Sequence, residues 1–141
     1  MPFSFSPGDI IYLEEVPYTD HPKYHLVLSV SDDMFFIINS NINKTVAVNT
    51  QFLNCQVKLS KNPHNSYMPK EESYIACHQL APDLFSGDIE AKIKAGKGEI
   101  KGKLDKSTLE QVINTVINHG AHTLSPYERR IIEENLKSVL S

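Results

Sequence analysis

Two imidazoles and one ammonium group stand within five residues of each other, at His21, Lys23 and His25. An imidazole titrates near neutral pH, so His25 is the best candidate for general acid or base chemistry. The alternative is a structural histidine on the outer side of a strand. His21 and His25 also have the i, i+4 spacing of a helical metal site, but Pro22 between them argues against a helix. We therefore expect neither a metal site nor a cofactor.

The elements that must position these side chains are short β-strands. Three apolar runs are rich in Val, Ile, Phe and Tyr and are bounded by turn residues, at 10–13, 24–30 and 34–38. The Ser-Asp-Asp link at 31–33 is short enough for an antiparallel hairpin. Strand alternation then separates His25 and Val27 from the opposite face, which carries Tyr24, Leu26 and Leu28. Further strands are expected at 45–48, 56–59 and 73–77.

The second part of the chain is helical in character. Residues 106–118 carry an apolar stripe, with Asp105 as the N-cap, and a capping box from Ser125 to Glu128 predicts a second helix. Residues 87–94 leave helix and strand open, and residues 95–103 predict a turn or hairpin. We expect a mainly β fold with C-terminal helices (α+β). Residues 1–80 would form a small SH3-like antiparallel β-barrel, and residues 81–141 a helical part packed on it in one compact domain.

Composition is that of an ordinary globular domain of 141 residues. No run approaches the ~20 apolar residues of a membrane span, and the first residues do not look like a signal peptide, so a cytoplasmic protein is expected. Cys55 and Cys77 predict buried free thiols, with a disulfide between them as the alternative.

The charge pattern bears on whether the chain can bind nucleic acid. A net charge of −3 argues against general binding to nucleic acid, although it permits a local basic groove. Lysines gather between residues 92 and 106, which suggests either a flap that contacts RNA or a solvated hairpin. The interleaved Glu99 and Asp105, and the lack of aromatic residues in this stretch, favour the hairpin.

Several short motifs resemble the MazF/PemK family of toxins. Gly8-Asp9-Ile10 opens a strand, a basic residue leads into Leu26-Val27-Leu28-Ser29, and the third strand ends in Asn39-Ser40. Weaker likenesses follow at 73–75, 79–80 and 102–112, so that the resemblance covers about residues 7 to 119. It implies the SH3-like barrel and sequence-selective, metal-independent RNA cleavage.

The resemblance also implies where the site lies. The family has an arginine at the start of the second strand and a Thr or Ser at the end of the third, and the nearest matches are Lys23 and Ser40. We therefore expect Lys23, His25 and Ser40 as catalytic residues, with substrate bound by His21, Asn39 and His64. An ammonium group is a point charge and cannot grip phosphate bidentately as arginine does. Either Lys23 and His25 substitute for the arginine, or the site is inert.

Two functions from different classes follow. The first is a toxin-fold endoribonuclease of a toxin-antitoxin system, and the alternative is a non-catalytic binding module of the same fold that holds a protein partner or nucleic acid. By resemblance, the partners would be a second copy in a homodimer, a small antitoxin protein and single-stranded RNA, with no membrane involved.

Overall fold

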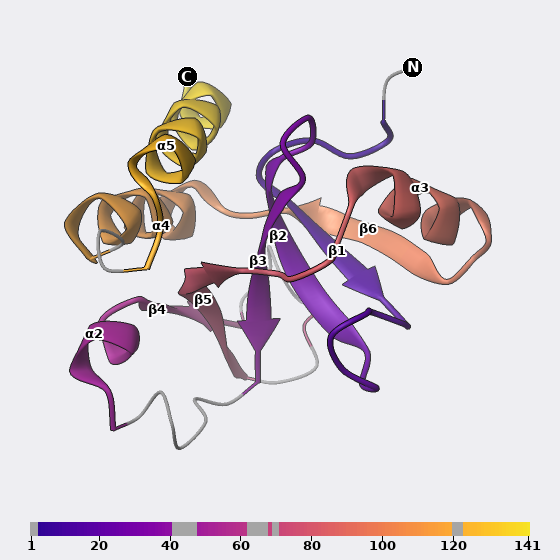
Figure 1. Cartoon of the computed structure of the whole chain (residues 1–141), viewed down its shortest axis with the longest axis horizontal. Helices are drawn as coiled ribbons and strands as arrows, with labels where there is room; N and C mark the ends of the chain where they lie inside the picture. The colour runs from indigo at the N-terminus through magenta and orange to yellow at the C-terminus, as the bar shows by residue number, and fades with distance from the viewer. Residues whose placement is uncertain (1–2, 41–47, 62–67, 69–70, 120–122) are drawn as a thin grey trace.

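The computed structural model describes residues 3–40, 48–61, 68, 71–119 and 123–141. Its described strands form one six-stranded antiparallel sheet in the order β4-β5-β3-β2-β1-β6 (Figure 1). The strands are β1 (Asp9–Leu13), β2 (Lys23–Ser29), β3 (Met34–Asn39), β4 (Gln56–Ser60), β5 (Glu72–Leu80) and β6 (Gly98–Lys103). The helices are α2 (Thr50–Leu53), α3 (Ser86–Lys94), α4 (Lys106–His119) and α5 (Pro126–Leu140). The chain is thus of the α+β class.

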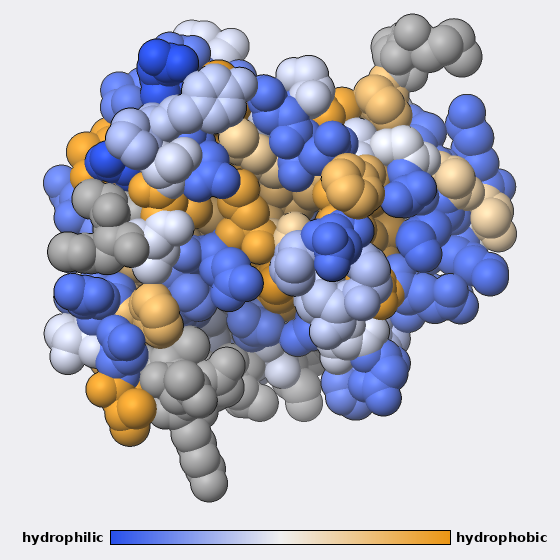
Figure 2. Space-filling view, in the orientation of Figure 1, coloured by the Kyte–Doolittle hydropathy of each residue, from blue (hydrophilic) through white to orange (hydrophobic). Residues whose placement is uncertain are grey.

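Both faces of the sheet are covered. On one face, Leu26 and Leu28 of β2 join a core cluster with apolar residues of α4 and α5. On the other face, Val27 joins a second cluster that includes Ile89 of α3. The predicted alternation along β2 is therefore confirmed. Figure 2 shows apolar side chains gathered in the middle of the visible face, between α5 and α3, with hydrophilic residues around them.

Most predicted elements are confirmed. β1 to β5 include the expected strands at 10–13, 24–30, 34–38, 56–59 and 73–77 within one or two residues, and both long helices begin as predicted. Asp105 caps α4 by accepting from the backbone N–H of Thr108 at 3.0 Å, and the capping box of Ser125 and Glu128 is present. The expected strand at 45–48 lies, except for its last residue, outside the described residues.

Two stretches of the second part had different outcomes. Residues 87–94, left open between helix and strand, lie in α3. The turn or hairpin expected at 95–103 is wrong for residues 98–103, which form the single strand β6 paired with β1. A strand from the second part of the chain thus completes the sheet of the first part. Among the described strands, β4 and β6 are the two edges.

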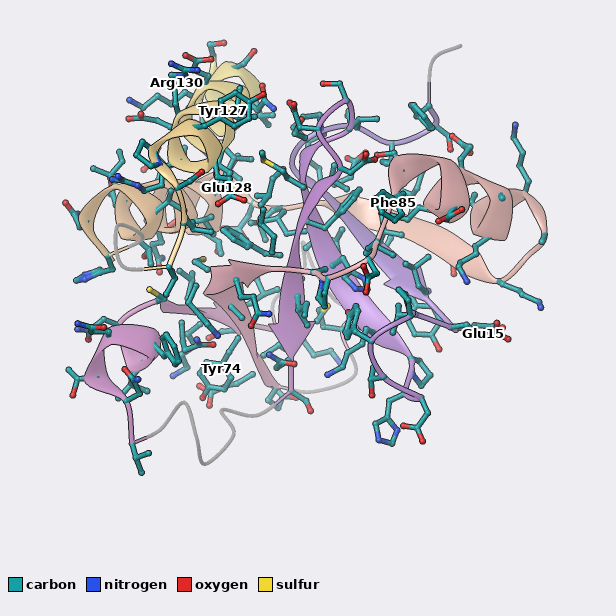
Figure 3. The ribbon with its side chains drawn as sticks, viewed as in Figure 1. Glu15, Tyr74, Phe85, Tyr127, Glu128 and Arg130 are labelled. Atoms are coloured by element: carbon teal, nitrogen blue, oxygen red, sulfur yellow. The ribbon has the colours of Figure 1, made fainter. Side chains whose placement is uncertain are left out.

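The tip of the β2–β3 hairpin ties the helices to the sheet. Asp33, which has a φ of 55°, accepts a hydrogen bond from the backbone N–H of Ser86 at 2.7 Å, at the first residue of α3. The Ser86 hydroxyl donates to the backbone oxygen of Val30 at 2.6 Å. On the other side, the hydroxyl of Tyr127, the second residue of α5, donates to Asp32 at 3.0 Å, and Figure 3 shows Tyr127 on that helix. Two adjacent aspartates therefore contact a helix from each face of the sheet.

We expect Asp33→Ala to lower the free energy of unfolding by about 1–2 kcal/mol, because it removes the acceptor at the α3 N-terminus and places alanine at a positive φ. Asp33→Asn is the matched control, since asparagine keeps an acceptor oxygen and tolerates this backbone conformation. It should cost less than half as much. Urea unfolding measures both, and equal losses in the two variants would contradict the role given to Asp33.

Candidate functional site

Three of the expected site residues share one face of the sheet. Lys23 and His25 are two apart on β2 and therefore point the same way. The Lys23 ammonium donates a hydrogen bond to the side-chain oxygen of Asn39 on β3 at 2.9 Å. Asn39 lies opposite Tyr74 of β5 in the antiparallel register. We call Lys23, Asn39 and Tyr74, which cross three adjacent strands, the sheet row.

His25 lies under the surface beside this row. Its side chain is 0% exposed, and its Nε2 atom pairs with the Tyr18 hydroxyl at 2.5 Å. Burial, and secondly the charge of Lys23, lower its pKa to about 3, against a weak opposing effect of the Ile11 backbone. Its Nδ1 atom is buried with no hydrogen bond of normal geometry. The imidazole is therefore neutral at physiological pH, and it is buried, not placed on the outer side of the strand as the structural alternative had it.

Lys23 is the cation of the site. Its side chain is half-buried, and this burial lowers the pKa of its ammonium group. The hydrogen bond to Asn39 holds the ammonium at the end of the β2–β3 hairpin that is far from the turn. It is thus positioned to meet a phosphate as a single positive charge.

The structure does not bring Ser40 onto the sheet row. Ser40 is exposed and directly follows Asn39, the last residue of β3. Successive strand residues point to opposite sides, so the pleat that aims Asn39 toward Lys23 does not aim Ser40 there.

The other histidines of the described residues do not gather around His25. The His21 side chain is 76% exposed and lies 3.4 Å from a carboxylate oxygen of Asp20, so it does not share a site with His25. His64 lies outside the described residues. His78 stacks on Phe52 of α2 at 4.8 Å between ring centroids, and its Nδ1 atom is 3.0 Å from the Gln56 amide. Within the described ranges, no three His, Cys, Asp or Glu side chains are grouped so as to hold a metal ion.

Sequence reasoning missed two tyrosines of the site. Tyr18 lies in the loop between β1 and β2, where a bridge between Val16 and Thr19 turns the chain back over His25. Burial raises the pKa of its phenol, which therefore stays protonated. Tyr74 lies near the start of β5, low in the view of Figure 3, and is half-buried. Only the strand register, which places it opposite Asn39, could have indicated it.

The lysines between residues 92 and 106 do not form an open basic flap. Lys101 pairs with Glu99 at 2.7 Å, Lys103 with Asp9 at 3.1 Å, and Lys97 lies 3.8 Å from Glu15. The stretch is not a solvated hairpin either, because it comprises the end of α3, the edge strand β6 and the first residue of α4. Cys55 and Cys77 are both free and buried, as expected.

No protein-family model matches this sequence, and no curated protein matches it. In the part of the chain that the structure describes, every helix is too short or too polar to cross a bilayer.

The buried imidazole predicts a pH-dependent stability. Below pH 6.5 the unfolded chain protonates His25 while the folded chain keeps it neutral down to about pH 3. The unfolded state then binds more protons, so this contribution to stability is complete above pH 6.5 and is lost as pH falls toward 3. Between pH 7 and 4.5 we expect His25 to account for a loss of about 2–3 kcal/mol.

Urea unfolding of the wild type and of His25→Gln at both pH values isolates this term, because glutamine does not titrate. The wild type should lose more stability than the variant over this range. The same loss in both proteins would show that His25 is not held neutral.

Proposed function

We propose that this chain is a MazF/PemK-like toxin-fold protein that binds single-stranded RNA at the sheet row and does not cleave it. It is then a non-catalytic binding module whose six-stranded sheet would be an opened form of the SH3-like barrel, with β4 and β6 left as edges. The observation that carries the proposal is the state of His25. A general acid or base must reach the substrate and exchange a proton near neutral pH. His25 is covered, bonded to Tyr18 and has its pKa lowered to about 3.

The sheet row supports binding through the chemistry of its three members. The Lys23 ammonium offers one positive charge to a phosphate oxygen, and the amide of Asn39 offers a donor and an acceptor. The ring of Tyr74, one strand further, is of the kind on which unpaired bases stack. A single positive charge gives weak, salt-sensitive affinity, in keeping with the net charge of −3.

The test combines binding with cleavage. A dye-labelled single-stranded RNA of mixed sequence is mixed with wild type, Lys23→Ala and Tyr74→Ala at low salt in the presence of EDTA. We expect binding by fluorescence anisotropy and an intact RNA on a denaturing gel. Lys23→Ala should weaken binding and flatten its salt dependence, and Tyr74→Ala should weaken it by about fivefold or more.

Tyr74→Phe, which keeps the stacking ring, and Lys137→Ala on α5 serve as controls that should bind as the wild type does. Lys137 is exposed and pairs with Glu133, remote from the row in sequence. The proposal is refuted if the wild type does not bind the RNA, or if Lys23→Ala and Tyr74→Ala bind it as tightly as the wild type does.

A metal-independent endoribonuclease of a toxin-antitoxin system is the second candidate, acting as a homodimer with a small antitoxin partner. One observation favours it. The only hydrogen bond from the described residues that covers His25 comes from Tyr18, in a loop bounded by exposed residues at both ends. If that loop lifts, His25, Lys23 and Asn39 face solvent together.

Cleavage of the same RNA in EDTA decides between the two candidates. The enzyme predicts cleavage by the wild type, lost in His25→Ala and in Lys23→Ala, and faster in Tyr18→Ala because the imidazole is uncovered. The binding module predicts no cleavage by any of these proteins. Circular dichroism must show that each variant is folded.

A further inference from the structure

The outer edge of β4 presents backbone groups that the sheet does not use. The Cys77 N–H donates to the Cys55 oxygen at 2.9 Å, and the Lys61 N–H donates to the Glu71 oxygen at 2.7 Å. Odd-numbered residues of β4 therefore bond to β5, and the N–H and C=O groups of Gln56 and Lys58 point away from it. No described residue forms a hydrogen bond with these outward backbone groups. Such an edge is a template for another strand.

A groove runs along this edge. Figure 1 shows β4 at the border of the sheet, with α4 above it and α2 at its start. The hollow between β4 and α4 has a volume of about 430 Å³. One wall is a polar row of α4, and the floor is β4; the lining residues are Gln56, Val57, Lys58, Gln111, Asn114, Thr115, Asn118 and His119. The unused backbone groups and the empty space thus coincide.

The side chains around the groove differ on its two sides. Val57 is buried in the core cluster under α4 and α5, so Lys58, its neighbour in the strand, points to the opposite face. An added strand would therefore meet the carboxamides of α4 on one side and the Lys58 ammonium on the other. Lys58 pairs with Glu72, which raises the pKa of its ammonium and keeps it charged, and this pair is exposed. Lys58 is the only lysine or arginine among the lining residues, and the one carboxylate paired with it, that of Glu72, comes from β5 and not from the groove lining.

We propose that an extended segment of a partner protein, with acidic residues alternating with uncharged polar ones, adds to β4 as a seventh antiparallel strand. Main-chain hydrogen bonds to Gln56 and Lys58 supply affinity, and the alternation supplies specificity. The acidic side chains lie beside Lys58, and the polar ones reach the α4 carboxamides. A second copy of this chain fits the groove less well. If its β4 paired with this β4, its own α4, which packs beside β4, would occupy the space of the groove.

The test uses a seven-residue peptide that alternates threonine with aspartate. Two counterparts are a peptide with lysine in place of aspartate, and the acidic peptide N-methylated at every second residue. Backbone amide NMR shifts locate binding, and fluorescence anisotropy measures affinity. We expect the acidic peptide to shift Gln56, Lys58, Asn114 and Asn118, and both counterparts to bind at least about tenfold more weakly.

Three variants separate the contributions of the backbone hydrogen bonds, the Lys58 charge and the α4 wall to peptide binding. Lys58→Pro removes the outward N–H together with the ammonium group, at an edge position that tolerates proline, and should weaken binding about tenfold or more. Lys58→Thr keeps the N–H and removes the charge, so it should weaken binding only about threefold. Asn114→Glu places a negative charge in the groove and should also weaken binding of the acidic peptide. Because Asn114 is exposed, this change should leave the fold intact.

The proposal is overturned if the acidic peptide leaves these amides unshifted or binds Lys58→Pro as it binds the wild type. It is also overturned if the wild type sediments as a dimer that Lys58→Pro converts to a monomer, because a second copy would then occupy the edge. Lys58 of the groove lies opposite Tyr74 of the sheet row, but Lys23 is three strands away, so loss of RNA binding in Lys23→Ala leaves this result unaffected.

Discussion

A neutral imidazole buried inside the sheet is the interaction on which the account of the site depends. Water stabilises the charged form of histidine, and the covered face of β2 removes that water. The nearby Lys23 ammonium acts in the same direction, so that two causes keep His25 uncharged. The Tyr18 hydroxyl then satisfies one ring nitrogen. The histidine thus contributes packing and a hydrogen bond, and the half-buried lysine above it is the group that remains open to a ligand.

The hairpin that carries this histidine also organises the whole chain. Its open end holds Lys23 against Asn39, and its turn holds Asp32 and Asp33. Through the two aspartates the turn contacts α5 on one side and α3 on the other. The β2–β3 hairpin therefore forms hydrogen bonds with helices on both faces of the sheet.

Much of the fold could be predicted from sequence because local signals and burial agree. The strand alternation around Leu26 to Leu28 and the capping box of α5 are local patterns, and both are confirmed. Residues 87–94 left helix and strand open because their periodicity is not decisive, and they lie in α3. Residues 95–103 predicted a turn or hairpin, but residues 98–103 form β6, whose state is set by pairing with β1, a contact about ninety residues away in sequence.

The site was predictable only in part, for the same reason. Lys23 lies beside Asn39, and not beside Ser40, because the β2–β3 register shifts between Val27 and Ser29, an irregularity that no local pattern predicted. The burial of His25 depends on the positions of the Tyr18 loop and of the second core cluster. No local sequence pattern predicts these positions. The most direct test of the account is an NMR titration of the His25 ring in the intact protein. The account predicts that the ring stays neutral from pH 7.5 down to about pH 4, and a midpoint near 6.5 would contradict it.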